Sequence, residues 1–264
     1  MSAVETVKLR EGKLKGAAME VKSIIEDYEM KAMGGLVAAW ELWERALLPS
    51  LLSGAGTWLG KIDETVKRCN QIQNFYWRLM CKVPESCPKL ALLCETFQVD
   101  MKFRIYYEKC QLLLQIKRLE KEALARQIYQ QAEDNNLPGL GREVRQICEE
   151  IQIPDLNKYN IEKEEIQTAV FEAHYSNMMN QFVHSKKLQD IKNNHFRGLQ
   201  DYFHDKNLAN ARLKFKIRTK MVEKGLANFK NRYFYNEACV ICSSCKVELT
   251  QNHLTLCPAR ASMR

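Results

Sequence analysis

The chain has 264 residues, of which 46% are hydrophobic and 27% charged, and its formal net charge is +8. This composition is typical of a globular protein with a substantial core, and it excludes extended disorder. Residues 1–16 are charged and lack the apolar run of a secretory signal. The most apolar stretch, 34–59, is interrupted by charges and a proline, so it should not cross a bilayer. We therefore expect an intracellular protein, nuclear or cytoplasmic, that has no membrane partner.

Apolar residues recur at helical spacing along most of the chain. In chain order, the pattern predicts helices over residues 13–33, 36–52, 63–82, 89–95, 100–133, 141–151 and 160–193. Pro49 is able to kink the second of these helices. The helix over 100–133 is apolar on two faces, which predicts a central position against several neighbours. Residues 213–217 alternate like a short strand, but the residues around them favour a helix, which we expect there.

The residues at 134–139 form a clear turn and are the best candidate for a domain boundary. We expect three parts: a helical region over 1–135, a helical linker with a basic end over 136–236, and a zinc knuckle over 237–264. The predicted fold class is thus mainly α, a helical bundle with a small C-terminal zinc knuckle.

Four of the ten cysteines and one of the five histidines lie in residues 239–264. Two residues separate Cys239 from Cys242, and three separate His253 from Cys257. Thiolates and an imidazole at such spacings hold a tetrahedral Zn²⁺ ion, and four protein ligands make a structural rather than a catalytic site. We predict one structural zinc ion on these four residues, with Cys245 either an alternative ligand for one of the first two cysteines or a free thiol. A cysteine-rich tail without metal is the competing interpretation. Metal binding would supply most of the folding energy of so short a segment.

A basic segment leads into this cluster. Between residues 205 and 232, nine Lys or Arg residues stand against two carboxylates. Such a concentration indicates a polyanion partner, RNA or DNA above all, and a solvated helix face is the competing interpretation. Aromatic residues among the charges could stack on unpaired bases or pack on a neighbouring helix. The predicted nucleic-acid contacts are Arg212, Lys214, Lys216, Arg218, Lys220, Lys224, Lys230, Arg232, Phe229 and Tyr233.

No motif predicts an active site. The chain has no adjacent Asp-Asp pair, no glycine-rich phosphate loop and no Gly-x-Ser-x-Gly. His174 and His184 on a polar helix, and His195 and His204 in a basic region, are expected to be ordinary surface or capping histidines. The other cysteines are expected to be buried thiols rather than disulfides or nucleophiles: Cys69, Cys81, Cys87, Cys94, Cys110 and Cys148.

Several segments resemble the C-terminal part of non-LTR retrotransposon (LINE-type) reverse transcriptases, and they occur in the same order. The first three are residues 20–27 with 34–36, after the polymerase palm; 42–58, LWERALLPSLLSGAGTW, around the thumb; and 73–79, QNFYWRL. The others are residues 83–92, VPESCPKLAL; 211–221, ARLKFKIRTKM, before the knuckle; and 248–258, ELTQNHLTLCP, in its second half.

The resemblance implies a parent enzyme that copies RNA into DNA at a nicked target, using Mg²⁺ held by a palm that would precede this chain. Residues 1–135 would be thumb-like, and 237–264 a CCHC-type knuckle. The implied role is to grip RNA or DNA during target-primed reverse transcription, without polymerisation by the chain on its own. Two alternatives stay open: a part of a longer active RNA-directed DNA polymerase, or a non-catalytic helical scaffold for protein partners.

Overall fold

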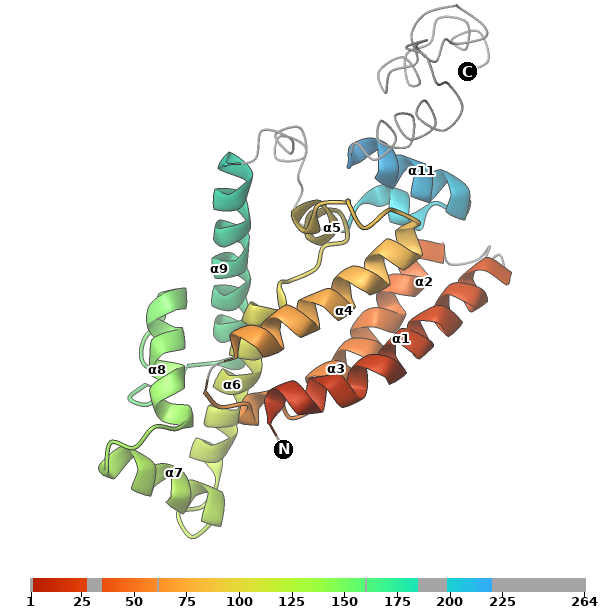
Figure 1. The fold of residues 1–264 in the computed structure, drawn as a ribbon. Coiled ribbons are helices and arrows are strands. Elements are labelled where there is room, and N and C mark those ends of the chain that lie inside the picture. The colour runs from red at the N-terminus through yellow and green to blue at the C-terminus, as the bar shows by residue number, and fades with distance from the viewer. Residues whose placement is uncertain (1, 28–34, 61, 160, 185–198, 220–264) are drawn as a thin grey trace, which may run out of the picture.

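The computed structural model describes residues 2–27, 35–60, 62–159, 161–184 and 199–219 (Figure 1). Over these ranges the regular structure is helical and no strand occurs. The predicted mainly α fold is therefore confirmed for the described part of the chain. No helix in that part is both long enough and apolar enough to span a bilayer.

The helices follow one another with short connections. Those up to residue 95 are α1 (Ala3–Asp27), α2 (Gly35–Leu42), the π turn η1 (Trp43–Leu47), α3 (Leu48–Leu52), the 3-10 turn η2 (Ala55–Thr57), α4 (Asp63–Cys81) and α5 (Lys89–Glu95). The later ones are α6 (Met101–Arg118), α7 (Leu124–Asp134), α8 (Leu140–Ile151), α9 (Lys163–Val183), the 3-10 turn η4 (Asp201–His204) and α11 (Leu208–Arg218). The predictions at 63–82, 89–95 and 141–151, and of a helix rather than a strand at 213–217, are confirmed.

Helix α1 begins at Ala3, earlier than the predicted start at residue 13. Ser2 and Glu5 explain the difference, because they form a capping box. The Glu5 N–H donates to Ser2 Oγ at 3.2 Å, and the Ser2 N–H donates to the Glu5 carboxylate at 2.8 Å. This reciprocal pair stabilises the first turn, and its Ser-x-x-Glu pattern is visible in the sequence.

The predicted helix over 36–52 is present but contains a π turn. In η1 the Leu48 N–H bonds to the Trp43 carbonyl, and α3 then begins with Pro49 in its first turn. A proline has no N–H to donate, and the first turn of a helix needs none. The π turn therefore restarts the helix at a point where Pro49 is tolerated.

The single helix predicted over 100–133 is wrong: the structure has two helices, α6 and α7, separated by a turn. Leu119 is extended, with φ −66° and ψ 155°, and the Arg126 side chain bonds to the Lys117 carbonyl that the end of α6 leaves open. Apolar spacing continues through the turn, and it contains no glycine or proline, so the sequence gives no signal for the break.

The first apolar core lies between α1, α2, α3 and α4. Helix α1 packs along α4, and the side chains of Trp43, Tyr76 and Trp77 are fully buried there. The rings of Trp43 and Tyr76 are 4.9 Å apart, and the Tyr76 hydroxyl donates to the Ala39 carbonyl at 2.6 Å. Phe215 of α11 belongs to the same core, so the helix that carries the basic segment is part of the framework.

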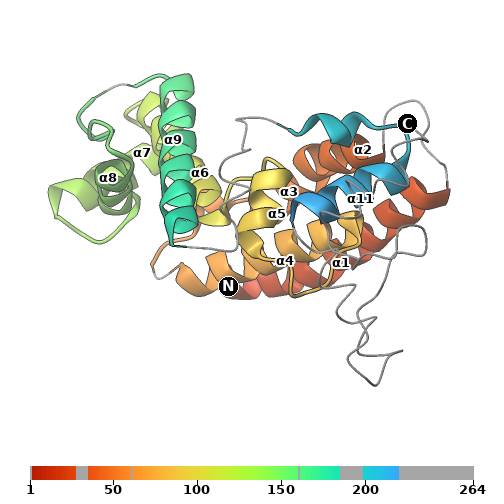
Figure 2. The ribbon, with the colours of Figure 1, turned by 90° about the horizontal axis from the view of Figure 1, so that it is seen from above.

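A second core forms where α6 packs against α8 and α9. Figure 2 shows the two groups of helices side by side, with α1, α2, α4 and α11 in one and α6 to α9 in the other. Because α6 contacts α4, α8 and α9, its predicted central position is confirmed. The turn at 134–139 joins helices of a single core, and the three-part division of the chain stays a prediction.

The cysteines outside residues 239–264 are all buried and none is in a disulfide. Burial raises the pKa of Cys69 to about 12, which keeps that thiol protonated and unreactive at neutral pH. The prediction of buried thiols is confirmed for all six: Cys69, Cys81, Cys87, Cys94, Cys110 and Cys148.

Candidate nucleic-acid interface

Helix α11 carries the described part of the basic segment, and local polar residues fix its start. The Asn207 side chain accepts hydrogen bonds from the N–H groups of Ala209 at 3.0 Å and Asn210 at 3.1 Å. Asp205 in turn accepts from the Asn207 N–H at 2.9 Å. These bonds satisfy donors that the first turn leaves open.

Arg212 points into the protein, with only 8% of its side chain exposed. Its Nε donates to the Met80 carbonyl at 2.7 Å, and its Nη2 lies 3.0 Å from Glu26 Oε1. Arg212 therefore ties α11 to the C-terminal ends of α4 and α1. The contact of Arg212 with nucleic acid stays a prediction. Its contacts in the structure hold α11 in place.

Arg218 has a similar structural partner. Its Nε lies 2.7 Å from Glu95 Oε2, and Glu95 of α5 is fully buried. The Tyr202 hydroxyl of η4 donates to the same carboxylate at 2.6 Å. Burial, and then the charge of Glu95, raise the pKa of Tyr202, so it remains a neutral donor. This network holds the far end of α11 on α5.

The two lysines of α11 differ in their surroundings. Lys214 is exposed and bonds to Asp205 at 2.9 Å. Lys216 is half-buried and makes no ion pair with any described residue. Of the four predicted contacts that the structure describes, Lys216 is thus the one whose charge is least balanced by a carboxylate.

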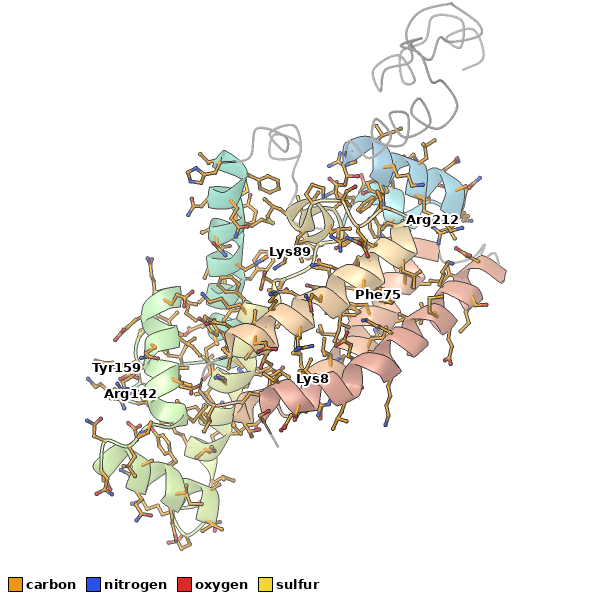
Figure 3. The ribbon with its side chains drawn as sticks, in the orientation of Figure 1. Lys8, Phe75, Lys89, Arg142, Tyr159 and Arg212 are labelled. Atoms are coloured by element: carbon orange, nitrogen blue, oxygen red, sulfur yellow. The ribbon has the colours of Figure 1, made fainter. Side chains whose placement is uncertain are left out.

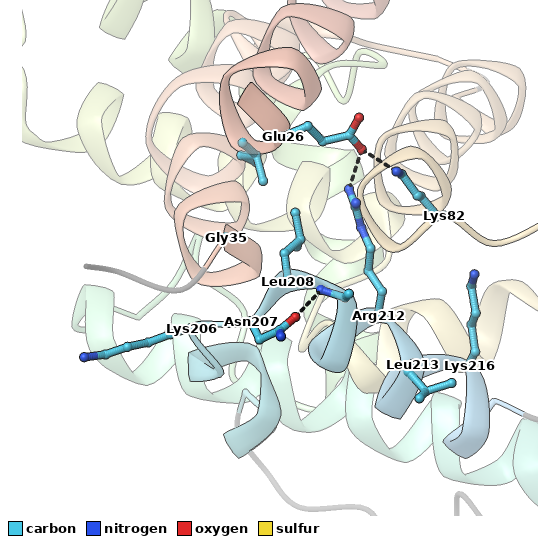
Figure 4. Close-up of a pocket in the computed structure, with 11 residues that line it drawn as sticks. Glu26, Gly35, Lys82, Lys206, Asn207, Leu208, Arg212, Leu213 and Lys216 are labelled. Carbon is cyan, nitrogen blue, oxygen red and sulfur yellow. Dashed lines mark hydrogen bonds and ion pairs between the residues drawn. The ribbon is translucent and has the colours of Figure 1, made fainter. Parts of the chain in front are cut away.

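A pocket of about 780 Å³ lies between α11, the ends of α1 and α4, and the start of α2 (Figure 4). Figure 3 places it, through Arg212, at the end of the molecule remote from Arg142 and Tyr159. Four basic side chains line it against one acidic side chain. These charged lining residues are Lys82, Lys206, Arg212, Lys216 and Glu26.

The charges of the pocket act on one another. Burial opposes ionisation of Glu26, but the hydrogen bond from Lys82 and the charge of Arg212 outweigh it and lower the pKa of Glu26. The Lys82 Nζ lies 3.0 Å from Glu26 Oε1. Burial, and then the positive charges of Arg212 and Lys82, lower the pKa of Lys216. The cations therefore repel one another, and a bound anion would relieve that repulsion.

The sequence pattern indicates Lys216 and Arg212 as contacts, but nothing in it indicates Lys82 or Glu26. Lys82 lies at the C-cap of α4, where φ is 51°, and Glu26 lies in the last turn of α1. Both belong to segments remote in sequence from the basic run. Only the packing of α1 against α4 and of α11 against α4 brings them together.

The remaining predicted contacts lie outside the described residues. They are Lys220, Lys224, Lys230, Arg232, Phe229 and Tyr233, together with the zinc ligands Cys239, Cys242, Cys245, His253 and Cys257. In the ranges that are described, no three His, Cys, Asp or Glu residues are grouped so that they could hold a metal ion. The zinc site stays a prediction.

Of the two positions expected for His174, surface or capping, the surface position is wrong, because the residue is buried and only 5% exposed. Its ring packs edge-to-face on Phe103 with centroids 5.5 Å apart, and Nδ1 lies 3.5 Å from the Asp100 nitrogen. Burial lowers the pKa of His174 to about 4, although the charge of Asp100 opposes this. His174 is buried because it lies on the face of α9 that packs into the protein. That face also carries Ile166, Val170, Met178 and Phe182. His184 and His204 are exposed, as expected, and His195 lies outside the described ranges.

The described part of the chain is thus an all-α protein with a basic pocket beneath α11. The sequence matches no protein-family model, and no curated protein or solved structure matches it significantly. The resemblance to LINE-type reverse transcriptases therefore stays a prediction, and the function has to be inferred from the site.

Proposed function

We propose that this chain binds single-stranded RNA or DNA through the phosphate backbone, as the resemblance to the C-terminal region of LINE-type reverse transcriptases implies. The observation that carries the proposal is the pocket beneath α11, which has four basic lining residues and one acidic one. It lies at the start of a segment, 205–232, that holds nine of the forty Lys and Arg residues. No catalytic step is assigned to the chain.

Lysines suit this role because they neutralise phosphates as point charges and release the counterions condensed on the strand. Binding of this kind is largely independent of sequence and weakens as salt rises. We expect dissociation constants on the order of micromolar or tighter at low salt.

The proposal includes a structural zinc ion held by Cys239, Cys242, His253 and Cys257, with Cys245 as the alternative ligand. Its support is the spacing of these residues in the sequence. The metal would give the C-terminal segment a fixed fold and keep it next to the basic run along the chain.

Fluorescence anisotropy with labelled single-stranded oligonucleotides tests the proposal. The full chain, prepared with zinc and shown to be folded by circular dichroism, should bind RNA and DNA of unrelated sequence with similar affinity. A peptide nucleic acid of the same base sequence, which has an uncharged backbone, is the matched ligand control and should bind much more weakly. Absence of binding to both RNA and DNA at low salt would sink the proposal.

A second candidate function is a scaffold for protein partners, and one observation favours it. Helix α7 has no buried residue, and it leaves Leu124 71% exposed and Ile128 58% exposed. Leu124 and Ile128 are four residues apart and so lie on one face of α7, and contiguous exposed apolar surface is typical of a protein-interaction site. A folded chain that binds no oligonucleotide would favour this candidate over the first.

A further inference from the structure

The pocket beneath α11 has features that a general basic surface lacks. Its volume of about 780 Å³ falls within the range of about 300–1,000 Å³ that is typical of small-molecule sites. It is also reached from solvent, because Lys206, Asn207 and Leu213 on its lining are exposed. A single-stranded nucleic acid could therefore enter the pocket without prior opening of the core.

We infer that this pocket is the subsite that holds the phosphodiester backbone, and that Lys82, Lys206 and Lys216 are the side chains that contact it. The inference rests on the proposed function and deepens it, because it names the contacts. Lys82 and Lys206 are not among the contacts predicted from the sequence, and Lys82 belongs to a different helix from the basic segment.

The assignment follows from how the charges are distributed. Glu26 is the one carboxylate of the lining, and it is engaged by Arg212 and Lys82, each at 3.0 Å. Lys206 and Lys216 form no ion pair with the residues that the structure describes. Lys206 and Lys216 therefore carry the unbalanced positive charge of the lining, and Lys82 adds a cation that shares Glu26 with Arg212.

Arg212 has a different part in this arrangement. Its Nε is bonded to the Met80 carbonyl, and its Nη2 is paired with Glu26. The two contacts fix the position of α11 against the ends of α4 and α1, and hence the positions of Lys206 and Lys216 relative to Lys82 (Figure 4). Arg212 is thus a positioning residue, and the lysines are the contacts.

The uncharged lining also suits a nucleotide better than a bare ion. Ile25, Leu208 and Leu213 form apolar parts of the wall, and the Leu213 side chain is 51% exposed. Apolar surface beside cations can take the sugar that accompanies each phosphate, as ligand pockets commonly combine an apolar wall with a few polar groups. An inorganic anion would use only the lysines.

The test compares four single-charge variants of the full chain in oligonucleotide titrations. K82Q, K206Q and K216Q should each weaken binding about four-fold at 0.15 M salt, and should each make the slope of log affinity against log salt shallower by about 0.7. K158Q is the matched control, since Lys158 is exposed and adjoins Tyr159 on the remote side of the molecule. It should bind as the wild type does.

A second measurement uses the unaltered chain, so that it does not depend on how variants fold. Lysine acetylation read by mass spectrometry should show Lys82, Lys206 and Lys216 protected by a bound oligonucleotide, and Lys158 unprotected. Inorganic phosphate at the same phosphate concentration should protect none of them.

The outcomes separate the two claims. If the wild type binds but the three variants match K158Q, or the three lysines stay reactive in the complex, the subsite is wrong while the proposed function stands. If inorganic phosphate protects the lysines as well as the oligonucleotide does, the pocket is a small-anion site, and the inference fails. If the wild type binds no oligonucleotide, both claims fail together.

Discussion

Arg218 of α11 and Glu95 of α5 form an ion pair of 2.7 Å, and the Glu95 side chain is fully buried. The pair joins the helix that carries the basic segment to the first half of the chain. Because Glu95 also accepts the Tyr202 hydroxyl bond at 2.6 Å, one carboxylate holds both η4 and α11. The position of the pocket lining on α11 therefore depends on a buried charge.

Removing that carboxylate should destabilise the protein. Glu95→Ala removes the Glu95 carboxylate from Arg218 and the acceptor of the Tyr202 hydroxyl. Breaking one partner of a buried pair costs about 3–5 kcal/mol, and we expect about 3 kcal/mol here because Arg218 is 28% exposed. Urea unfolding measures the change. Glu149→Ala, at an exposed site of α8, is the control and should change stability by less than about 0.5 kcal/mol. Equal stability of the two variants would show that the network contributes nothing.

His174 should make the protein less stable in mild acid. Its pKa is lowered from 6.5 to about 4 by burial, so below pH 6.5 the unfolded chain takes up a proton that the folded chain does not. Stability is then greatest above about pH 6.5 and falls as the pH drops toward 4, by about 3 kcal/mol from this group alone.

The check is the free energy of unfolding measured at several pH values between 4 and 7. His174→Gln has no proton to gain and should flatten the profile in this window. His184→Gln, at an exposed position, should keep the wild-type profile. The groups that face His174 are Asp100, Arg104 and Lys89. A wild-type slope in His174→Gln would assign the pH dependence to other groups.

Two glycine substitutions of equal size should have opposite effects. A Cβ on Gly56 would lie 2.9 Å from the Glu108 carbonyl oxygen and 2.9 Å from Leu112 Cβ, where η2 meets α6. Gly56→Ala should therefore destabilise the protein by about 1–3 kcal/mol. Gly12 lies within α1 and has nothing within 4 Å of an added Cβ, so Gly12→Ala should stabilise it by about 0.5–1 kcal/mol. Thermal unfolding of both variants measures the difference, and a harmless Gly56→Ala would contradict the close approach.

The predicted zinc site can be tested by measuring the number of zinc ions bound per chain. The purified chain should contain one zinc ion, and Cys242→Ser or His253→Ala should abolish tight binding, because each removes one of four ligands. Cys245→Ser is the informative control: it keeps one zinc ion if Cys239 and Cys242 are both ligands. Loss of the metal in that variant would overturn the ligand assignment, and a metal-free wild type would overturn the site.

Helices that carry their own end signals could be predicted from the sequence. Helix α5 matches its prediction because Pro88 precedes it, and α4 ends within one residue of the prediction. The break between α6 and α7 could not be predicted, because Leu119 continues the apolar spacing and the turn depends on a bond from Arg126 to a carbonyl of another helix. The local apolar pattern predicts that a helix forms here, but the contact of Arg126 with the Lys117 carbonyl determines where α6 ends.

The candidate site was predictable only in part. The excess of positive charge around α11 is visible in the sequence, and it predicts Lys216 as a contact. The inward orientation of Arg212 was not visible, because it depends on Glu26 and Met80. Lys82 carries no local signal at all. Its role follows from the place where α4 ends beside α1 and α11.

The most direct test of the account is the salt dependence of oligonucleotide binding by the full chain. The dissociation constant for a short single-stranded RNA should be measured over a series of salt concentrations. If Lys82, Lys206 and Lys216 each neutralise one phosphate, log affinity should fall linearly with log salt, with a slope of about −2 or steeper. A slope near zero, or equal affinity for an uncharged peptide nucleic acid of the same sequence, would contradict the claim that this chain binds the phosphate backbone.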